Sequence, residues 1–209
     1  MRAVTSRAGA GQAASQLALG EMYAEGECVP ENPAEALHWY LKAANQKLPE
    51  AMLKVGRCYA KGLGVDRNLE RSLKWYHEAG AAGSMDAQHL LGTMYARGRS
   101  VPQDYEKSAR WFLAAARSGD RRAELIYGQM LRDGRGVPKS TTKAYIWLLN
   151  ATKTRAGGKV DPVLLKTLRE LEMKLTPEEK KHADTVMDNI LTHRVAVETA
   201  HQDTEKGTV

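Results

Sequence analysis

The segment with the most obvious chemical potential is residues 134–140, with the sequence GRGVPKS. A glycine-rich loop that ends in Lys-Ser binds phosphate when its backbone N–H groups and its lysine surround the anion. Such a loop carries a glycine directly before the lysine and follows a β-strand, whereas Lys139 follows Pro138 and the segment follows a helical pattern. We therefore interpret its glycines as turn residues and predict no phosphate site here.

The other reactive side chains do not form a known metal-binding or catalytic pattern. The sequence contains no His-Glu-x-x-His motif, no cysteine cluster and no Gly-x-Ser-x-Gly elbow. The adjacent Glu178 and Glu179 suit the first turn of a helix, where the helix dipole favours acidic residues. The histidines are His38, His77, His89, His182, His193 and His201. We expect no catalytic residue, no metal site and no cofactor.

Cys28 and Cys58 are too few for a disulfide framework, so we expect reduced thiols and a cytoplasmic protein. No apolar run approaches the roughly 20 residues that span a bilayer, so no membrane insertion is expected. Residues 1–16 lack the apolar stretch of a secretory signal, although a mitochondrial-type presequence is an alternative. If the chain is a trimmed fragment, an exported location stays open.

Four residue types recur through the chain with a period of 36 residues. The columns are Gly20, Gly56, Gly92 and Gly128; Tyr23, Tyr59, Tyr95 and Leu131; Trp39, Trp75, Trp111 and Trp147; and Ala43, Ala79, Ala115 and Ala151. Every tryptophan of the chain belongs to one of these columns, which chance placement would rarely produce. The sequence is therefore a repeat array.

One repeat predicts two helices joined by a turn. In residues 87–96 the apolar side chains follow helical spacing, and Gly98 stands where a left-handed C-cap is expected. Asp104 precedes a second apolar-periodic run and suits an N-cap. We name these elements helix A and helix B. Two helices of about 12 residues cannot bury a face alone, so neighbouring hairpins must stack, with the glycines allowing close approach and the aromatics filling the core.

The pattern A-x-x-x-L-G-x-x-Y-x-x-G-x-G-V, followed by A-x-x-W-Y-x-x-A-A-x-x-G, is similar to the Sel-one-like repeat, a relative of the tetratricopeptide repeat. The resemblance covers residues 13 to 155. It implies an all-α protein, a right-handed α/α solenoid of four 36-residue helix-turn-helix repeats at residues 13–156, closed by C-terminal capping helices at residues 157–195. We expect a disordered tail at residues 196–209 and interpret residues 1–12 as the end of a preceding helix, because Ala8 and Gly11 fall in helix B columns.

Two sequence signals begin the expected C-terminal helices. Asp161-Pro162 is an N-cap followed by a proline at the first helical position, and Thr176 with Glu179 forms a capping box. The second helix would carry Ala183, Val186, Met187, Ile190 and Leu191. A docking or dimerisation face on one of these helices is the alternative to a capping role.

The resemblance to tetratricopeptide repeats implies that the A helices line a concave groove. Its solvent-facing positions are Glu21, Arg57, Thr93 and Gln129, directly after the repeat glycine, and Glu25, Lys61, Arg97 and Asp133, four residues later. Three residues before the glycine lie Leu17, Leu53, His89 and Leu125. We expect a groove that is acidic in the first repeat, basic in the second and third, and partly apolar along its floor. Met22, Cys58, Met94 and Met130 form a further column, interpreted as core rather than as an adaptable binding surface.

These features favour a non-catalytic protein-interaction module, an adaptor, scaffold or regulatory binding protein. Its partner would be a protein or peptide, with Arg57, Lys61 and Arg97 meeting an acidic or carboxylate-bearing segment, although an ordinary solvated face explains the same charges. The net charge of +6 and the pI near 9.3 suggest nucleic acid or another polyanion as the alternative, weakened because the basic residues are scattered. An enzyme such as a β-lactam hydrolase, suggested by some relatives, is less favoured.

Overall fold

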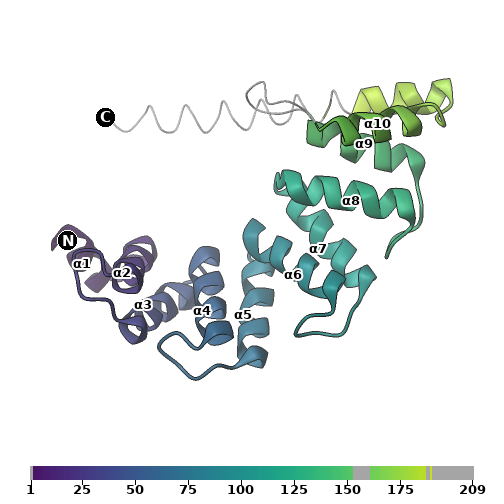
Figure 1. Ribbon diagram of the computed structural model, residues 1–209. Helices are drawn as coiled ribbons and strands as arrows, with labels where there is room; N and C mark the ends of the chain where they lie inside the picture. Colours follow the sequence, from purple (N-terminus) through teal and green to yellow (C-terminus); the bar gives the residue numbers. More distant parts are fainter. Residues whose placement is uncertain (1, 153–160, 187–188, 190–209) are drawn as a thin grey trace, which may run out of the picture. The chain divides into compact units, whose positions relative to one another are not determined.

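The computed structural model describes residues 2–152, 161–186 and 189, and every regular element in these ranges is an α-helix (Figure 1). The helices are α1 (Arg2–Gly9), α2 (Ala13–Glu25), α3 (Pro33–Asn45), α4 (Pro49–Lys61), α5 (Leu69–Ala81), α6 (Met85–Arg97), α7 (Tyr105–Arg117), α8 (Arg121–Asp133), α9 (Thr141–Thr152) and α10 (Pro162–Glu172). Residues 177–186 are also helical. The A helices of the four repeats are α2, α4, α6 and α8, and the B helices are α3, α5, α7 and α9.

The chain folds into two compact units, Met1–Asp120 and Arg121–Val209. The first unit contains α1 and the first three hairpins, and the second contains the fourth hairpin, α10 and the helix at residues 177–186. The boundary between the units falls between the third and fourth repeats. We call them the first and second unit.

Cap residues define the helix ends as the sequence predicted. Asp104 accepts a hydrogen bond from the Lys107 N–H at 2.9 Å, and α7 begins at the next residue. Gly98 has a φ of 66° and ends α6, and its N–H donates to the Met94 carbonyl. Asn32 and Asn68 cap α3 and α5 in the same way as Asp104 caps α7. The turn chemistry of the sequence therefore sets the hairpin boundaries.

The repeat glycines place helix A directly against the aromatic side chain of its own helix B. A Cβ at Gly20 would lie 2.6 Å from the Tyr40 ring, and a Cβ at Gly56 would lie 2.5 Å from the Tyr76 ring. Phe112 stands against Gly92 in the same way, at 2.9 Å. Only a residue without a side chain allows this approach, which confirms the predicted role of the glycine column.

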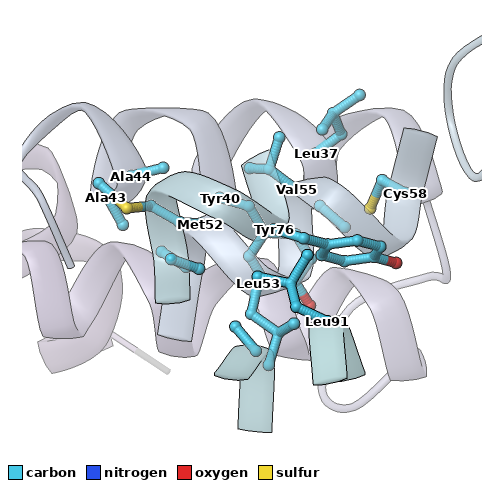
Figure 2. Packing of buried hydrophobic residues seen from close by; sticks show 14 of the residues in the cluster. Leu37, Tyr40, Ala43, Ala44, Met52, Leu53, Val55, Cys58, Tyr76 and Leu91 are labelled. Carbon is cyan, nitrogen blue, oxygen red and sulfur yellow. The ribbon is translucent and has the colours of Figure 1, made fainter. Parts of the chain in front are cut away.

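The hydrophobic core of the first unit continues from one hairpin to the next. Figure 2 shows side chains from successive helices meeting in it, including Tyr40 of α3, Val55 of α4, Tyr76 of α5 and Leu91 of α6. Because each helix contributes to the packing on both its neighbours, no hairpin has a core of its own.

The tryptophan column lies at the edge of this core. Trp75 and Trp111 are half-buried and pack against the core, and a Cβ at Gly80 would lie 2.8 Å from the Trp111 ring. Trp39 is also half-buried, and the Lys42 ammonium lies 4.1 Å from the centre of its ring. The tyrosines and phenylalanine that follow the tryptophans are the more deeply buried aromatics.

Helix α1 ends with the geometry of a helix B. Gln16 donates its side-chain N–H to the Ala8 carbonyl at 3.2 Å, and Gln88 donates to the Gly80 carbonyl at 2.9 Å, two repeats further on. Gly11 has a φ of 88°, close to the 96° of Gly83. The contact of α1 with α2 therefore repeats the contact that α5 makes with α6.

In the second unit, a further helix packs against the fourth hairpin. Thr176 and Glu179 form the predicted capping box, with hydrogen bonds of 2.9 and 3.2 Å, and the helix that follows buries Ala183 against Ile146 of α9. Glu179 also accepts a hydrogen bond from Thr142 at the start of α9. Met187, Ile190, Leu191 and the tail at residues 196–209 lie outside the described residues.

Candidate protein-binding face

The predicted site residues of the first unit lie on α2, α4 and α6, which occupy equivalent positions in three consecutive hairpins. We call the solvent-facing side of these three helices the A-helix face. Lys54 of α4 reaches Glu21 of α2, with 2.6 Å between its Nζ and Oε1, so side chains of neighbouring A helices meet on this face. Gln129 and Asp133 belong to α8 in the second unit.

Three cations of the A-helix face are exposed. Arg57 and Lys61 lie on α4, and Arg97 lies in the last turn of α6. Within residues 2–152, 161–186 and 189, none of the three forms an ion pair. Basic residues in the last turn of a helix also offset the negative end of its dipole, which gives Lys61 and Arg97 a local stabilising role.

The first repeat is less acidic than its sequence suggests. The Glu21 carboxylate is already bound by Lys54, which is not among the predicted site residues. Glu25, one turn further along α2, is exposed and forms no ion pair among the described residues. Of the two predicted carboxylates of the first repeat, Glu25 is thus the one that forms no ion pair.

The charges of the A-helix face affect the pKa of two buried tyrosines. Burial raises the pKa of Tyr40, and the carboxylates of Glu21 and Glu25 raise it further. Burial likewise raises the pKa of Tyr76, but a hydrogen bond with Ser72 and the positive charge of Arg57 act in the opposite direction. Tyr40 and Tyr76 occupy the same position in successive B helices, but carboxylates act on the first and a guanidinium acts on the second.

The expected apolar floor is wrong at Leu53. This side chain is only 4% exposed and belongs to the core that contains Leu91, so it cannot line an open groove. Leu17 is half-buried against the same core. Leu53 is buried because the core that contains it is formed by residues of successive helices from α3 to α6.

His89 replaces the leucine of this column and forms a polar contact. Its Nδ1 lies 2.5 Å from Oδ2 of Asp120, and its ring stands edge-on to Phe112. The side chains of His89 and Asp120 are 27% and 13% exposed, so the pair is mostly buried. His89 is therefore engaged within its own repeat, and Thr93, one turn further along α6, is half-buried.

The two site residues of the second unit differ in availability. Gln129 is exposed on α8. Asp133 accepts two hydrogen bonds from Arg132, at 2.7 and 3.1 Å, and these bonds lower the pKa of its carboxyl. The Asp133 carboxylate is thus partly neutralised by its neighbour in sequence.

Lys54 was the main residue missed by the sequence reasoning, although a signal was present. Its column reads Ala18, Lys54, Leu90 and Ile126, so a lysine stands where the other repeats carry apolar side chains. A charge in an otherwise apolar column indicates a specific partner, which the structure identifies as Glu21.

The methionine column lies partly within the core, as interpreted from the sequence. Cys58 and Met130 are each 5% exposed, and Met94 packs against the core of the first unit. Burial raises the pKa of the Cys58 thiol, so this thiol is a weak nucleophile. Cys28 is exposed, and both cysteines are free thiols.

Residues 2–152, 161–186 and 189 hold no group of three or more His, Cys, Asp or Glu side chains that could bind a metal ion. None of the helices in the same ranges has the length and apolar composition needed to cross a membrane.

Stacked helical hairpins define an α-solenoid repeat protein. In this chain the repeat glycines pack against large side chains of the B helices, and charged side chains lie on the solvent side of the A helices. The chain belongs to the Sel1 repeat family. The pattern of the Sel1 repeat matches residues 13–48, 49–84, 86–120 and 121–153, which are the four repeats found from the 36-residue period.

The chain is also similar to several solved structures, of which the first supports the assignment. A Sel1 repeat protein from Oxalobacter formigenes is 36% identical, with a TM-score of 0.72 over 80% of this chain and 47% of that chain. Another is c5321, a protective antigen of uropathogenic Escherichia coli with an SLR fold, at 22% identity and a TM-score of 0.47 over 89% of this chain and 47% of that chain. A third is Helicobacter pylori cysteine-rich protein B, at 22% identity and a TM-score of 0.46 over 62% of this chain and 91% of that chain. This chain thus spans about half the length of the first two. A comparison with curated proteins finds no match.

Proposed function

We propose that the chain is a protein-interaction module that binds an acidic segment of a partner protein on its A-helix face. Sel1 repeat proteins are generally protein-interaction modules, and the family is typically non-catalytic. The observation that carries the proposal is the group of exposed cations Arg57, Lys61 and Arg97, which form no ion pair within the described ranges of the chain.

The position of these cations favours a carboxylate-bearing partner. Lys61 and Arg97 occupy the same column of successive A helices, so the array holds them at a spacing set by the stacking of the hairpins. Exposed ion pairs contribute only about 0.2–1 kcal/mol each, so binding requires several of them at once. A rigid array supplies this because the cations are positioned before the partner arrives.

The test is affinity capture from a lysate of the source cells with three forms of the full chain. The first is wild type, and the second carries Arg57→Glu, Lys61→Glu and Arg97→Glu. The third carries Lys74→Glu, Arg110→Glu and Arg117→Glu, three exposed cations of the B helices α5 and α7, and so has the same net charge as the second. Far-ultraviolet circular dichroism establishes that all three are folded.

We expect a protein retained by wild type and by the B-helix variant, and lost by the A-helix variant. Retention should also fall as salt is raised, because exposed charges are screened beyond a Debye length of about 8 Å at physiological ionic strength. Equal retention by all three forms would exclude the A-helix face. Retention of nucleic acid that persists at about 0.2 M salt would favour the polyanion alternative instead.

A further inference from the structure

We infer that the partner segment carries both signs of charge, with a cationic group facing α2 and carboxylates facing α4 and α6. This inference rests on the proposed function and specifies the chemistry of the partner. Its basis is the reversal of charge between the first and second repeats of the A-helix face.

The reversal occurs within a single column. The last turns of α2, α4 and α6 present Glu25, Lys61 and Arg97, all exposed and none in an ion pair among the described residues. The three helices have equal length and end at glycines with nearly equal φ angles of 72°, 74° and 66°. The three side chains therefore project from equivalent backbone positions, and they differ in the sign of their charge.

Two tyrosines behind the A helices are close to these charges. Tyr40 lies close enough to Glu21 and Glu25 for both carboxylates to act on its hydroxyl, and Tyr76 lies close enough to Arg57. These tyrosines come from α3 and α5, the layer behind the A helices. The change of sign thus occurs in two columns, from Glu21 to Arg57 and from Glu25 to Lys61.

Lys54 does not remove the acidic character of the α2 end. Its Nζ is 2.6 Å from Oε1 of Glu21 and 6.0 Å from the centre of the Tyr40 ring, so this lysine lies against Glu21 and Tyr40. Glu25 forms no ion pair among the described residues. No lysine or arginine occurs in the sequence between Arg7 and Lys42, so the first hairpin supplies no cation from α2 or from its loop.

Glu25 acts mainly by excluding the wrong partner. A uniformly acidic segment laid across the three A helices would bring a carboxylate against Glu25, and like charges in contact oppose binding. A segment with a lysine or arginine at that end removes the repulsion and adds an ion pair. The same reversal selects against a nucleic-acid backbone, which carries negative charge along its whole length.

The test is selection from a displayed library of random 12-residue peptides against the full chain. Wild type is compared with Glu25→Lys, which gives α2 the charge that Lys61 and Arg97 give α4 and α6. The matched control is Glu35→Lys, the same charge change at an exposed position of α3 whose column carries Arg71 and Lys107 in the next repeats. Peptides from each selection are then resynthesised with their cationic end changed to serine, and affinities are measured by fluorescence anisotropy.

For wild type and for the Glu35→Lys control, we expect selected peptides with Lys or Arg gathered at one end and Asp or Glu at the other. Removal of the cationic end should weaken their binding to wild type roughly two- to fivefold, the effect of one exposed ion pair. Glu25→Lys should select peptides that are acidic throughout.

Peptides that are acidic throughout for wild type, or an unchanged pattern for Glu25→Lys, would overturn the inference. If the peptides selected by wild type do not bind the variant with Arg57→Glu, Lys61→Glu and Arg97→Glu, the proposed function stands and only the inference of a mixed-charge segment is overturned. Absence of any enriched peptide would count against both.

Discussion

Lys47 has a left-handed backbone conformation at a position where three other turns of this type have glycine. In the turn after helix B, Gly11, Gly83 and Gly119 have positive φ angles, and in the second turn of this column Lys47 has a φ of 66°. A residue with a Cβ in this region loses roughly 1–2 kcal/mol relative to an ordinary conformation. Lys47 is exposed, so its side chain gains no packing in return.

We therefore predict that Lys47→Gly stabilises the protein. The expected gain is about 1 kcal/mol, because the greater freedom of glycine in the unfolded chain offsets part of the relief. Urea denaturation followed by circular dichroism measures it. Ala82→Gly is the control. Ala82 lies directly before Gly83 in the corresponding turn of the next repeat and has an ordinary φ of −78°, so this substitution should lower the stability of the protein. A loss of stability with Lys47→Gly would contradict the prediction.

His77 is a second position where one residue departs from its column. Leu41, Leu113 and Leu149 stand at this place in the other repeats. Its Nε2 lies 3.0 Å from the Tyr95 hydroxyl, and its ring packs beside Trp111. Burial lowers the pKa of His77, and the positive charge of Lys107 lowers it further.

The lowered pKa predicts a pH dependence of stability. Above the unfolded-state pKa of about 6.5, His77 is neutral in both states and has no effect. As the pH falls from there toward the lower folded-state pKa, the unfolded chain takes up the proton first, so the free energy of unfolding decreases. Urea titrations at pH 7.5 and 5.5 should show a larger decrease for wild type than for His77→Leu. Equal decreases would exclude His77 as the cause.

At the scale of the helix, the contact between the repeat glycine and a large side chain of helix B determines how each hairpin closes. Four glycines meet Tyr40, Tyr76, Phe112 and Leu148 at distances that leave no room for a methyl group. Glycine in a helix interior costs roughly 0.5–1 kcal/mol relative to alanine, so the array accepts a weaker helix in exchange for closer packing.

Gly56→Ala should therefore destabilise the protein despite the better helix propensity of alanine. Its Cβ would lie 2.5 Å from Cε1 of Tyr76, and overpacking of this kind costs roughly 1–3 kcal/mol. Thermal denaturation gives the change. Gly9→Ala is the control, because nothing lies within 4 Å of a Cβ at that position, and it should have little effect. Equal effects of the two substitutions would show that close approach is not the reason for glycine.

At the scale of the whole molecule, identical backbone units carry different charges. The four repeats share their glycines, their capping turns and a tryptophan column, whereas the solvent-facing positions of the A helices vary from Glu to Arg, Lys, Thr, Gln and Asp. A repeat array can vary these positions independently because they do not contribute to the core. The net charge of +6 adds a general attraction for acidic partners that ionic strength weakens.

The sequence by itself determined the number of repeats, the helix pairs and most helix boundaries. These follow from interactions between residues close together in the chain, such as the Asp104 cap of α7 and the Thr176–Glu179 capping box. The 36-residue period also identified the glycine column, because a residue required by the same contact in every hairpin recurs at the same place.

Only the tertiary structure decided which charges are available on the A-helix face. Leu53 is buried in the core. Glu21 is bound by Lys54 from the next A helix, and His89 is bound by Asp120 from the turn after α7. These pairings join residues about 30 positions apart, and they depend on the spacing between helices and on side-chain conformation. A column read along the sequence shows which position faces a neighbour, but not whether a partner of opposite charge already stands there.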